Sequence, residues 1–167
     1  SGRSLVLTSH PYPAYSGSGE VSETTLSKYE CSNDYQKAIL TLKLLLSDDV
    51  VRTVSTHSSS QYAITIGQSI LSISGLVLAP TKVGPGQATV TATLGPLTIS
   101  LAVDVSDVPL EVSSTTVEFP STFSGLLSST NLIEVSADFE DGTKRPEAHT
   151  INGLLSYSSS DASIISI

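Results

Sequence analysis

The chain has 167 residues and carries 8 Lys and Arg against 16 Asp and Glu, a formal net charge of -8 at pH 7. This length allows one or two domains. The acidic balance argues against nucleic acid and against an anionic membrane surface as partners, because both need clustered cations. No apolar run reaches the ~18 residues that a membrane-spanning helix needs, so we expect no membrane insertion in this segment.

The first part of the chain predicts two strands with an irregular stretch between them. Residues 4–8 (SLVLT) alternate and form the first strand. Residues 9–36 are rich in Ser, Gly, Tyr and Pro and show no sustained period. Residues 38–46 (AILTLKLLL) have the composition of a helix or a strand, and we favour the strand because their later counterpart, residues 132–139, alternates and is β-branched.

Turn signals divide the next part of the chain. Asp48-Asp49 predicts a turn, and residues 61–66 and 69–73 predict a pair of strands around Gly67-Gln68. Residues 79–87 (APTKVGPGQ) hold two Pro and two Gly, which is typical of a loop.

A β-hairpin is the clearest local prediction. Residues 88–94 (ATVTATL) place Val90, Ala92 and Leu94 on one face, and residues 97–105 (LTISLAVDV) alternate in the same way. Gly95-Pro96 supplies the turn between them. We therefore expect these two strands to bury one face each in a common core.

The chain repeats itself. Asp48 to Asp141 is an offset of 93 residues, Tyr62 to Tyr157 is 95, and Ser69 to Ser163 is 94. An aromatic-Pro element, Tyr12-Pro13, also recurs as Phe119-Pro120. Self-similarity at a fixed period indicates an array of like units, and a period of this length fits a β-sandwich of roughly 100 residues.

The repeat predicts two modules with a short linker. We expect an all-β chain of tandem sandwich modules, with residues 1–106 as the first module and residues 107–167 as the first half of a second, incomplete one. A strand should end within residues 103–109, and so short a tether would restrict the angle between the modules. The first copy carries an insertion of about 14 residues near 17–36, estimated from the spacing of the repeated elements.

The hairpin region resembles a known family. The run GQATVTATLGPLTISLAVDV, preceded by SILSISGLV, is similar to the bacterial Ig-like (Big) domain family, with the matching positions at Ser69–Val77, Gly86, Ala88, Val90, Ala92, Val103 and Val105. FEDGT at 139–143 resembles the first half of the same pattern. The resemblance implies an Ig-like sandwich in a surface or extracellular protein. The family shares no catalytic residues, and none is implied here.

Reactive residues do not form a recognisable centre. His10, His57 and His149 lack metal-ligand spacing, and the acids near the Asp141 turn favour a structural turn over a calcium loop. We therefore expect no catalytic, cofactor or metal site. Cys31 has no second cysteine to pair with inside the chain, which leaves an inert thiol or a pairing outside this segment.

The tyrosines before residue 36 are the main candidates for an interface. Exposed tyrosine is favoured in protein interfaces and in sugar-stacking sites. Local packing over a sandwich edge is the alternative role. The candidate interface residues, which include the lone cysteine, are Tyr12, Tyr15, Tyr29, Cys31 and Tyr35.

The sequence predicts a non-enzymatic structural repeat of an extracellular or cell-surface protein, such as a stalk, filament or adhesin spacer. Its expected partners are neighbouring Ig-like modules of the same chain, like chains in a filament, or a glycan or protein ligand. Two alternatives stay open. One is a carbohydrate- or protein-binding module acting through the Tyr-rich region 12–35, and the other is the accessory domain of an enzyme.

Overall fold

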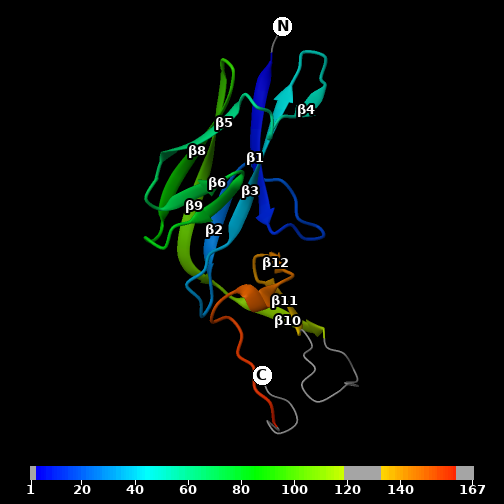
Figure 1. Ribbon diagram of the computed structural model, residues 1–167, viewed down its shortest axis with the longest axis vertical. Coiled ribbons are helices and arrows are strands. Elements are labelled where there is room, and N and C mark those ends of the chain that lie inside the picture. Colours follow the sequence, from blue (N-terminus) through cyan, green and yellow to red (C-terminus); the bar gives the residue numbers. More distant parts are fainter. Residues whose placement is uncertain (1–2, 119–132, 161–167) are drawn as a thin grey trace.

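The chain is an all-β protein, as its alternating pattern predicts, and its strands form three sheets (Figure 1). The computed structural model describes residues 3–118 and 133–160, and within these ranges the only helical segment is a 3-10 turn, η1 (Ala148–Thr150). The strands are β1 (Ser4–Tyr12), β2 (Thr24–Tyr29), β3 (Lys37–Leu45), β4 (Val51–Thr53), β5 (Ser60–Ile66), β6 (Leu71–Ser74), β7 (Val77–Pro80), β8 (Gly86–Leu94), β9 (Leu97–Leu110), β10 (Val112–Glu118), β11 (Glu134–Phe139) and β12 (Lys144–Arg145).

Two of the sheets pack face to face as a sandwich, which we call the first unit. One sheet has the order β1-β3-β7-β6 with β4 on β3, and the other has the order β2-β9-β8-β5. Alternate residues of the long strands turn inward, so that Leu42, Val90 and Val103 are 0% exposed. The predicted hairpin is therefore confirmed as β8 and β9, which supply much of this core.

The third sheet belongs to a smaller second unit below the sandwich (Figure 1). Its order is β10-β11-β12, with both pairings antiparallel. This order repeats the pairing of β1, β3 and β4 in the first unit, where β3 also lies between two antiparallel neighbours. The backbone thus shows the same internal repeat as the sequence. The recurring element at Phe119-Pro120 lies outside the described residues.

Three local predictions were wrong. Residues 61–66 and 69–73 do not pair with each other, because β5 pairs with β8 while β6 pairs with β7 in the opposite sheet. Gly67, with a φ of +76°, carries the chain between the sheets against the backbone of Ala88. The expected loop at 79–87 contains the end of β7 and the start of β8, and the irregular stretch at 9–36 contains β2.

The expected linker is also not a loop. β9 does not end near Val105 but continues to Leu110. The reason is that β2 pairs in parallel with β9 along this length, matching Thr24 with Val103 and Tyr29 with Leu110. Backbone hydrogen bonding therefore holds the chain in a strand where a short linker between the modules was expected.

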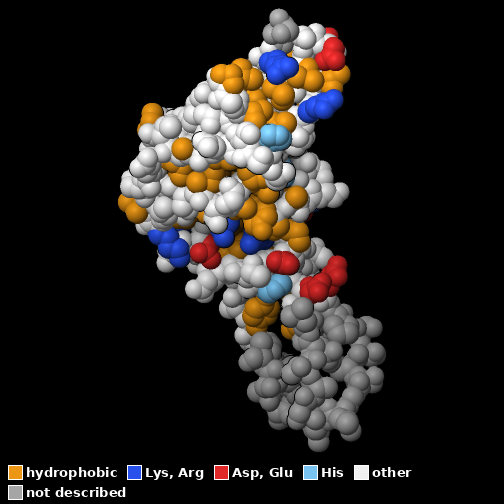
Figure 2. All heavy atoms as spheres, turned by 45° about the horizontal axis from the view of Figure 1, so that its top comes forward, with side chains coloured by type: hydrophobic (Ala, Val, Ile, Leu, Met, Phe, Trp, Pro, Cys, Tyr) orange, Lys and Arg blue, Asp and Glu red, His pale blue; other side chains and the backbone are white. Residues whose placement is uncertain are grey.

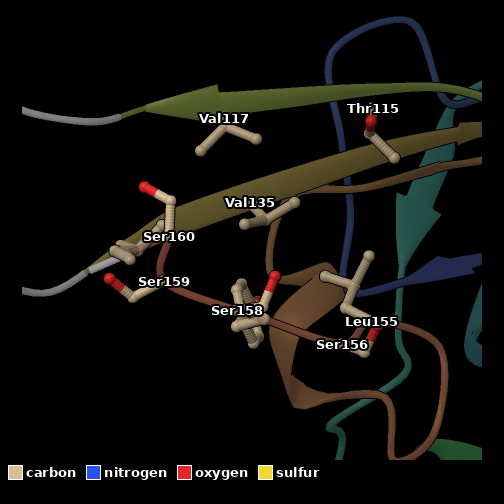
Figure 3. A pocket seen from close by; sticks show the side chains of 10 residues that line it. Thr115, Val117, Val135, Leu155, Ser156, Ser158, Ser159 and Ser160 are labelled. Carbon is tan, nitrogen blue, oxygen red and sulfur yellow. The ribbon is translucent and has the colours of Figure 1, made fainter. Parts of the chain in front are cut away.

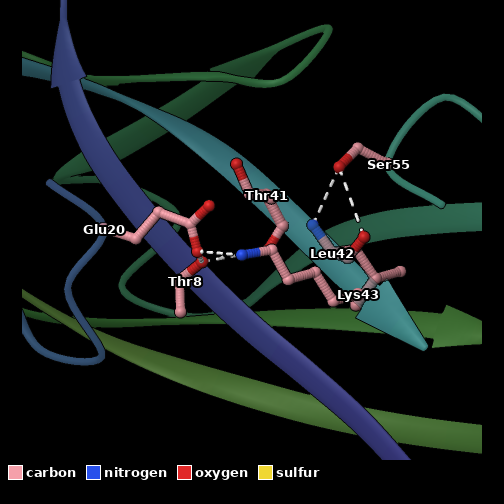
Figure 4. Close-up of polar contacts among 6 residues, drawn as sticks. All are labelled: Thr8, Glu20, Thr41, Leu42, Lys43 and Ser55. Atoms are coloured by element: carbon pink, nitrogen blue, oxygen red, sulfur yellow. Dashed lines mark hydrogen bonds and ion pairs between the residues drawn. The ribbon is translucent and has the colours of Figure 1, made fainter. Parts of the chain in front are cut away.

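The segment before β2 is held on the outside of the first sheet. The Oε2 atom of Glu20 accepts hydrogen bonds from Thr8 Oγ1 at 2.9 Å and from Lys43 Nζ at 2.7 Å (Figure 4). These bonds lower the pKa of the Glu20 carboxyl. Ser9 and Val21 exchange backbone hydrogen bonds nearby. Part of the β1 edge is thus paired, which protects it from strand addition.

Candidate functional site: the junction between the units

The junction between the two units is built mainly by β2 and the turn that follows it. On β2, Thr24 and Leu26 point into the first unit and are 7% and 2% exposed. A register shift between Ser27 and Lys28 changes the alternation of inward and outward residues. The next inward residue, Tyr29, therefore lies beyond the sandwich and enters the core of the second unit.

Tyr29 is the apolar centre of the junction. It is 4% exposed, and its ring centroid lies 5.0 Å from that of Phe139 on β11, with the planes tilted by 39°. Burial raises the pKa of the Tyr29 hydroxyl. The buried residues of this cluster are Tyr29, Leu110, Val135, Ala137, Phe139, Ala148 and Ile151. The core of the second unit is thus completed by a side chain of the first.

Gln36 joins the units through a network of polar contacts. Its Nε2 donates to Asp141 Oδ2 at 2.9 Å and to Thr143 Oγ1 at 3.0 Å. Its Oε1 accepts from the backbone amide of Ser27 at 2.9 Å. The side chain is 7% exposed, and its carboxamide is hydrogen-bonded at both ends. A buried amide satisfied in this way fixes a unique arrangement of its partners.

Further polar contacts surround these two residues. The backbone amide of Asn152 donates to Asp34 Oδ2 at 3.3 Å, and the amide of Glu30 donates to the carbonyl of Leu110 at 3.1 Å. The guanidinium of Arg145 donates to the carbonyl of Tyr12 at 3.3 Å. The contacts thus extend from β1 to β12 across the whole junction.

Cys31 and Gly153 meet by their backbones. A Cβ atom at Gly153 would lie 2.7 Å from the carbonyl oxygen of Cys31, and Gly153 has a φ of +84°. Cys31 itself has a φ of +54° and an exposed side chain. The thiol faces solvent, while the backbone at Cys31 takes part in the junction.

Tyr35 fastens the same turn to the end of β9. Its hydroxyl donates a hydrogen bond to Asp107 Oδ1. This bond is the main cause that raises the pKa of Tyr35 to about 12. Tyr35 and Asp107 are 72 residues apart in sequence. Their contact joins the turn after β2 to the last part of β9.

The candidate residues therefore fall into two groups. Tyr29, Cys31 and Tyr35 lie together at the junction, whereas Tyr12 is 43% exposed at the end of β1 and Tyr15 is half-buried in the following loop. Sequence reasoning did not identify Gln36, Phe139 or Asp141 as junction residues. The one signal that marks Gln36 is that it ends the insertion found in the first copy only.

A second hollow opens in the small unit itself. Val117 on β10 and Val135 on β11 point into a pocket of about 530 Å³, and Leu155 lies across from them (Figure 3). Its wall also includes Ser156 and, after Tyr157, the three consecutive serines 158–160. Tyr157 is 44% exposed here, although its counterpart Tyr62 donates a hydrogen bond to the carbonyl of Ser55 at 2.9 Å.

The described residues contain no group of three or more His, Cys, Asp or Glu side chains placed to hold a metal ion. The histidines lie on separate elements: His10 on β1, His57 before β5 and His149 in η1. His57 Nδ1 accepts a hydrogen bond from the amide of Ser59 at 3.1 Å. Within the described ranges, no helix has the length and apolar character needed to cross a membrane.

Comparisons with known proteins find similarity at the level of structure. No family model matches the sequence, and no curated protein matches it. Among solved structures, domains 6-7 of the surface layer protein SbsC are similar, with a TM-score of 0.40 and 13% identity. The match covers 84% of this chain and 64% of the SbsC chain, so this chain spans less than two thirds of the length of the SbsC structure. The resemblance to the bacterial Ig-like family stays a prediction.

Proposed function

We propose that this chain is a non-enzymatic structural segment of an extracellular or cell-surface protein, in which Ig-like units are held at a fixed angle to build a stalk, filament or adhesin spacer. The junction carries this proposal. Tyr29 of the first unit is buried against Phe139 of the second, and β9 runs into the second unit without a loop.

The energetics of the junction favour one fixed arrangement. Burying a large apolar side chain stabilises by about 1.5–3 kcal/mol, and each satisfied hydrogen bond adds about 0.5–1.5 kcal/mol. Tyr29 and the two bonds from Gln36 to the second unit thus contribute several kcal/mol. Because about 1.4 kcal/mol changes a population tenfold, a form with separated units is a minor species. A spacer needs a fixed angle between its units, because only then are its two ends held in a fixed orientation.

The strand order of the first unit supports the Ig-like part of the proposal. The sheets β1-β3-β7-β6 and β2-β9-β8-β5 correspond to the ABED and CFG sheets of Ig-type sandwiches, with β2 added beside β9. The low charged fraction of 14% supports an extracellular setting. Neither the strand order nor the charged fraction points to a catalytic site.

The location is tested on cells of the source organism. An antibody raised against the purified chain should label intact, unpermeabilised cells or detect the protein in the medium. Protease added to intact cells should remove the signal, while a cytosolic marker survives. Labelling that appears only after lysis would refute an extracellular or surface role.

A ligand-binding role for region 12–35 has weaker support. Tyr29 is buried, and Tyr35 is half-buried with its hydroxyl bonded to Asp107, so neither residue presents a fully exposed ring beside Tyr12. A glycan array separates the two roles. Binding by the wild-type chain that is lost on replacement of Tyr12 and Tyr15 would favour the ligand-binding role over the spacer.

A further inference from the structure

The turn between β3 and β4 and the turn between β11 and β12 have the same pattern of backbone hydrogen bonding. In the first, the amide of Leu46 donates to the carbonyl of Val50 at 3.0 Å. In the second, the amide of Phe139 donates to the carbonyl of Thr143 at 2.9 Å. Both pairs of residues are 93 positions apart, which is the offset of the sequence repeat at this point.

The side chains at the centre of the two turns also correspond. Asp48 Oδ1 accepts from the amide of Val50 at 3.4 Å, and Asp141 Oδ1 accepts from the amide of Thr143 at 2.8 Å. The next residue has a positive φ in both turns, +59° at Asp49 and +81° at Gly142. Both carboxylates thus accept from the amide of their own turn at Oδ1. Asp141 Oδ2 also accepts from Thr143 Oγ1 at 2.8 Å, whereas the first turn has Val50 in the place of Thr143 and offers Asp48 Oδ2 no such hydroxyl.

The two turns differ in what covers them. In the second unit, Phe139 is 2% exposed beneath Tyr29, and Asp141 Oδ2 accepts from Gln36. In the first unit, Leu46, the counterpart of Phe139, is half-buried, and Val50 and Val51 are 41% and 56% exposed. Within the described residues, the only hydrogen bond to the Asp48 side chain comes from its own turn. The turn of the first unit is thus more exposed than the corresponding turn of the second unit, chiefly at the places of Phe139 and Thr143.

This surface lies at the end of the first unit that is farthest from the junction, where β4 and the start of β1 flank the end of β3 (Figure 1). Figure 2 shows hydrophobic side chains gathered at this end beside acidic and basic ones. The combination of apolar side chains and an acceptor carboxylate matches the Phe139 and Asp141 pair of the second unit. Isolated exposed apolar residues are common, but an apolar cluster beside a prepared acceptor indicates a contact surface.

We propose that Leu46, Asp48, Val50 and Val51 form a docking surface for the end of another Ig-like unit, one that presents a tyrosine ring and a carboxamide as the Tyr29–Gln36 end does. The ring would lie over Leu46, in the place that Tyr29 takes over Phe139. The carboxamide would donate to Asp48 Oδ2. The proposal rests on the proposed spacer function, because it extends the same junction to the opposite end of the first unit.

The occupant is not a second copy of the intact chain. In each copy the Tyr29–Gln36 end is already covered by the second unit of that copy. A complementary end must therefore come from a unit whose own tyrosine and carboxamide are uncovered.

A graft within the full chain tests the proposal. The turn of the first unit reads Leu-Ser-Asp-Asp-Val, so the combined substitutions Phe139→Leu, Glu140→Ser, Gly142→Asp and Thr143→Val place it against the Tyr29–Gln36 end, with Asp141 kept. The measurement is hydrogen exchange of the junction amides of Glu30 and Asn152, which bond to Leu110 and Asp34.

If the turn of the first unit fits this end, protection of both amides stays within about tenfold of the wild type. Adding Asp141→Ala to the graft then lowers it by a further factor of about ten, since the acceptor for Gln36 is lost. A graft that loses more than about a hundredfold of the protection would overturn the proposal. That outcome leaves the spacer function standing if the wild-type amides are protected, whereas unprotected wild-type amides would contradict the spacer function itself.

Discussion

The Nε2 atom of Gln36 donates a hydrogen bond to Asp141 Oδ2 at 2.9 Å, joining residues that are 105 positions apart. The same carboxylate holds its own turn through the amide of Thr143. One side chain thus shapes the β11–β12 turn and binds that turn to the first unit. The relationship makes the Asp141 turn the polar half of the junction, with Tyr29 and Phe139 as its apolar half.

Replacing Asp141 should therefore cost more than replacing its counterpart. Asp141→Ala removes two bonds within its turn, from the amide and the hydroxyl of Thr143, and leaves the buried Gln36 amide without this partner, whereas Asp48→Ala removes a single bond within its turn. We expect Asp141→Ala to lower the free energy of unfolding by about 1–3 kcal/mol more than Asp48→Ala. Urea denaturation of both variants measures the difference. Equal losses would show that the bonds to Asp141 Oδ2, from Gln36 and from Thr143 Oγ1, add nothing.

Tyr29 should be among the most sensitive positions of the chain. Tyr29→Ala removes a buried ring from the shared core and is expected to cost about 3–5 kcal/mol, with exposure of the Phe139 ring. Ile66→Ala serves as the control, because Ile66 is 62% exposed and its loss should stay within about 0.5 kcal/mol. Thermal unfolding compares the two. A Tyr29→Ala variant as stable as Ile66→Ala would show that the Tyr29 ring is not part of a hydrophobic core.

Two glycines with similar backbone angles should respond differently to alanine. Gly153 and Gly142 have φ values of +84° and +81°, so alanine strains the backbone about equally at both. Only at Gly153 would the new Cβ meet another segment, 2.7 Å from the carbonyl oxygen of Cys31. Gly153→Ala should therefore reduce the protection of the Asn152 amide, while Gly142→Ala should not. Hydrogen exchange of the Asn152 amide measures this difference. Equal protection in both variants would argue against the close approach of Gly153 to the Cys31 carbonyl.

The bond between Tyr35 and Asp107 predicts a dependence on alkaline pH. The pKa of Tyr35 is raised to about 12 in the folded chain, above the value near 10 of an unfolded tyrosine. A raised pKa contributes stability that is complete below pH ~10 and is lost as the pH rises through about 12. Burial also raises the pKa values of Tyr29 and Tyr62, so these residues act in the same direction.

Comparing the wild type with Tyr35→Phe isolates this contribution. The variant should be less stable than the wild type at pH 8, and the two urea midpoints should converge as the pH approaches 12. A difference that stays constant over this range would mean that the hydroxyl is not held by Asp107.

The hairpin of β8 and β9 could be predicted from sequence because everything needed is local. A period of two, β-branched residues and a Gly-Pro turn all indicate the same structure there. β2 could not be predicted in this way. The register shift between Ser27 and Lys28 interrupts its alternation, so the inward positions Leu26 and Tyr29 are three residues apart and not two.

The junction lay beyond sequence reasoning for a different reason. Its contacts join residues about a hundred positions apart, such as Gln36 with Asp141, and nothing in either local pattern refers to the other. The repeat still carried part of the information. It marked residues 17–36 as present in one copy only, and this stretch contains Tyr29, Tyr35 and Gln36.

The fixed angle between the units is the central claim, and residual dipolar couplings of the backbone amides test it most directly. The couplings of β1–β9 and of β10–β12 in the weakly aligned full chain are fitted separately. A rigid junction predicts one alignment tensor, with the same magnitude and orientation for both units. A clearly smaller magnitude for the second unit would show that it moves independently, and it would contradict the account.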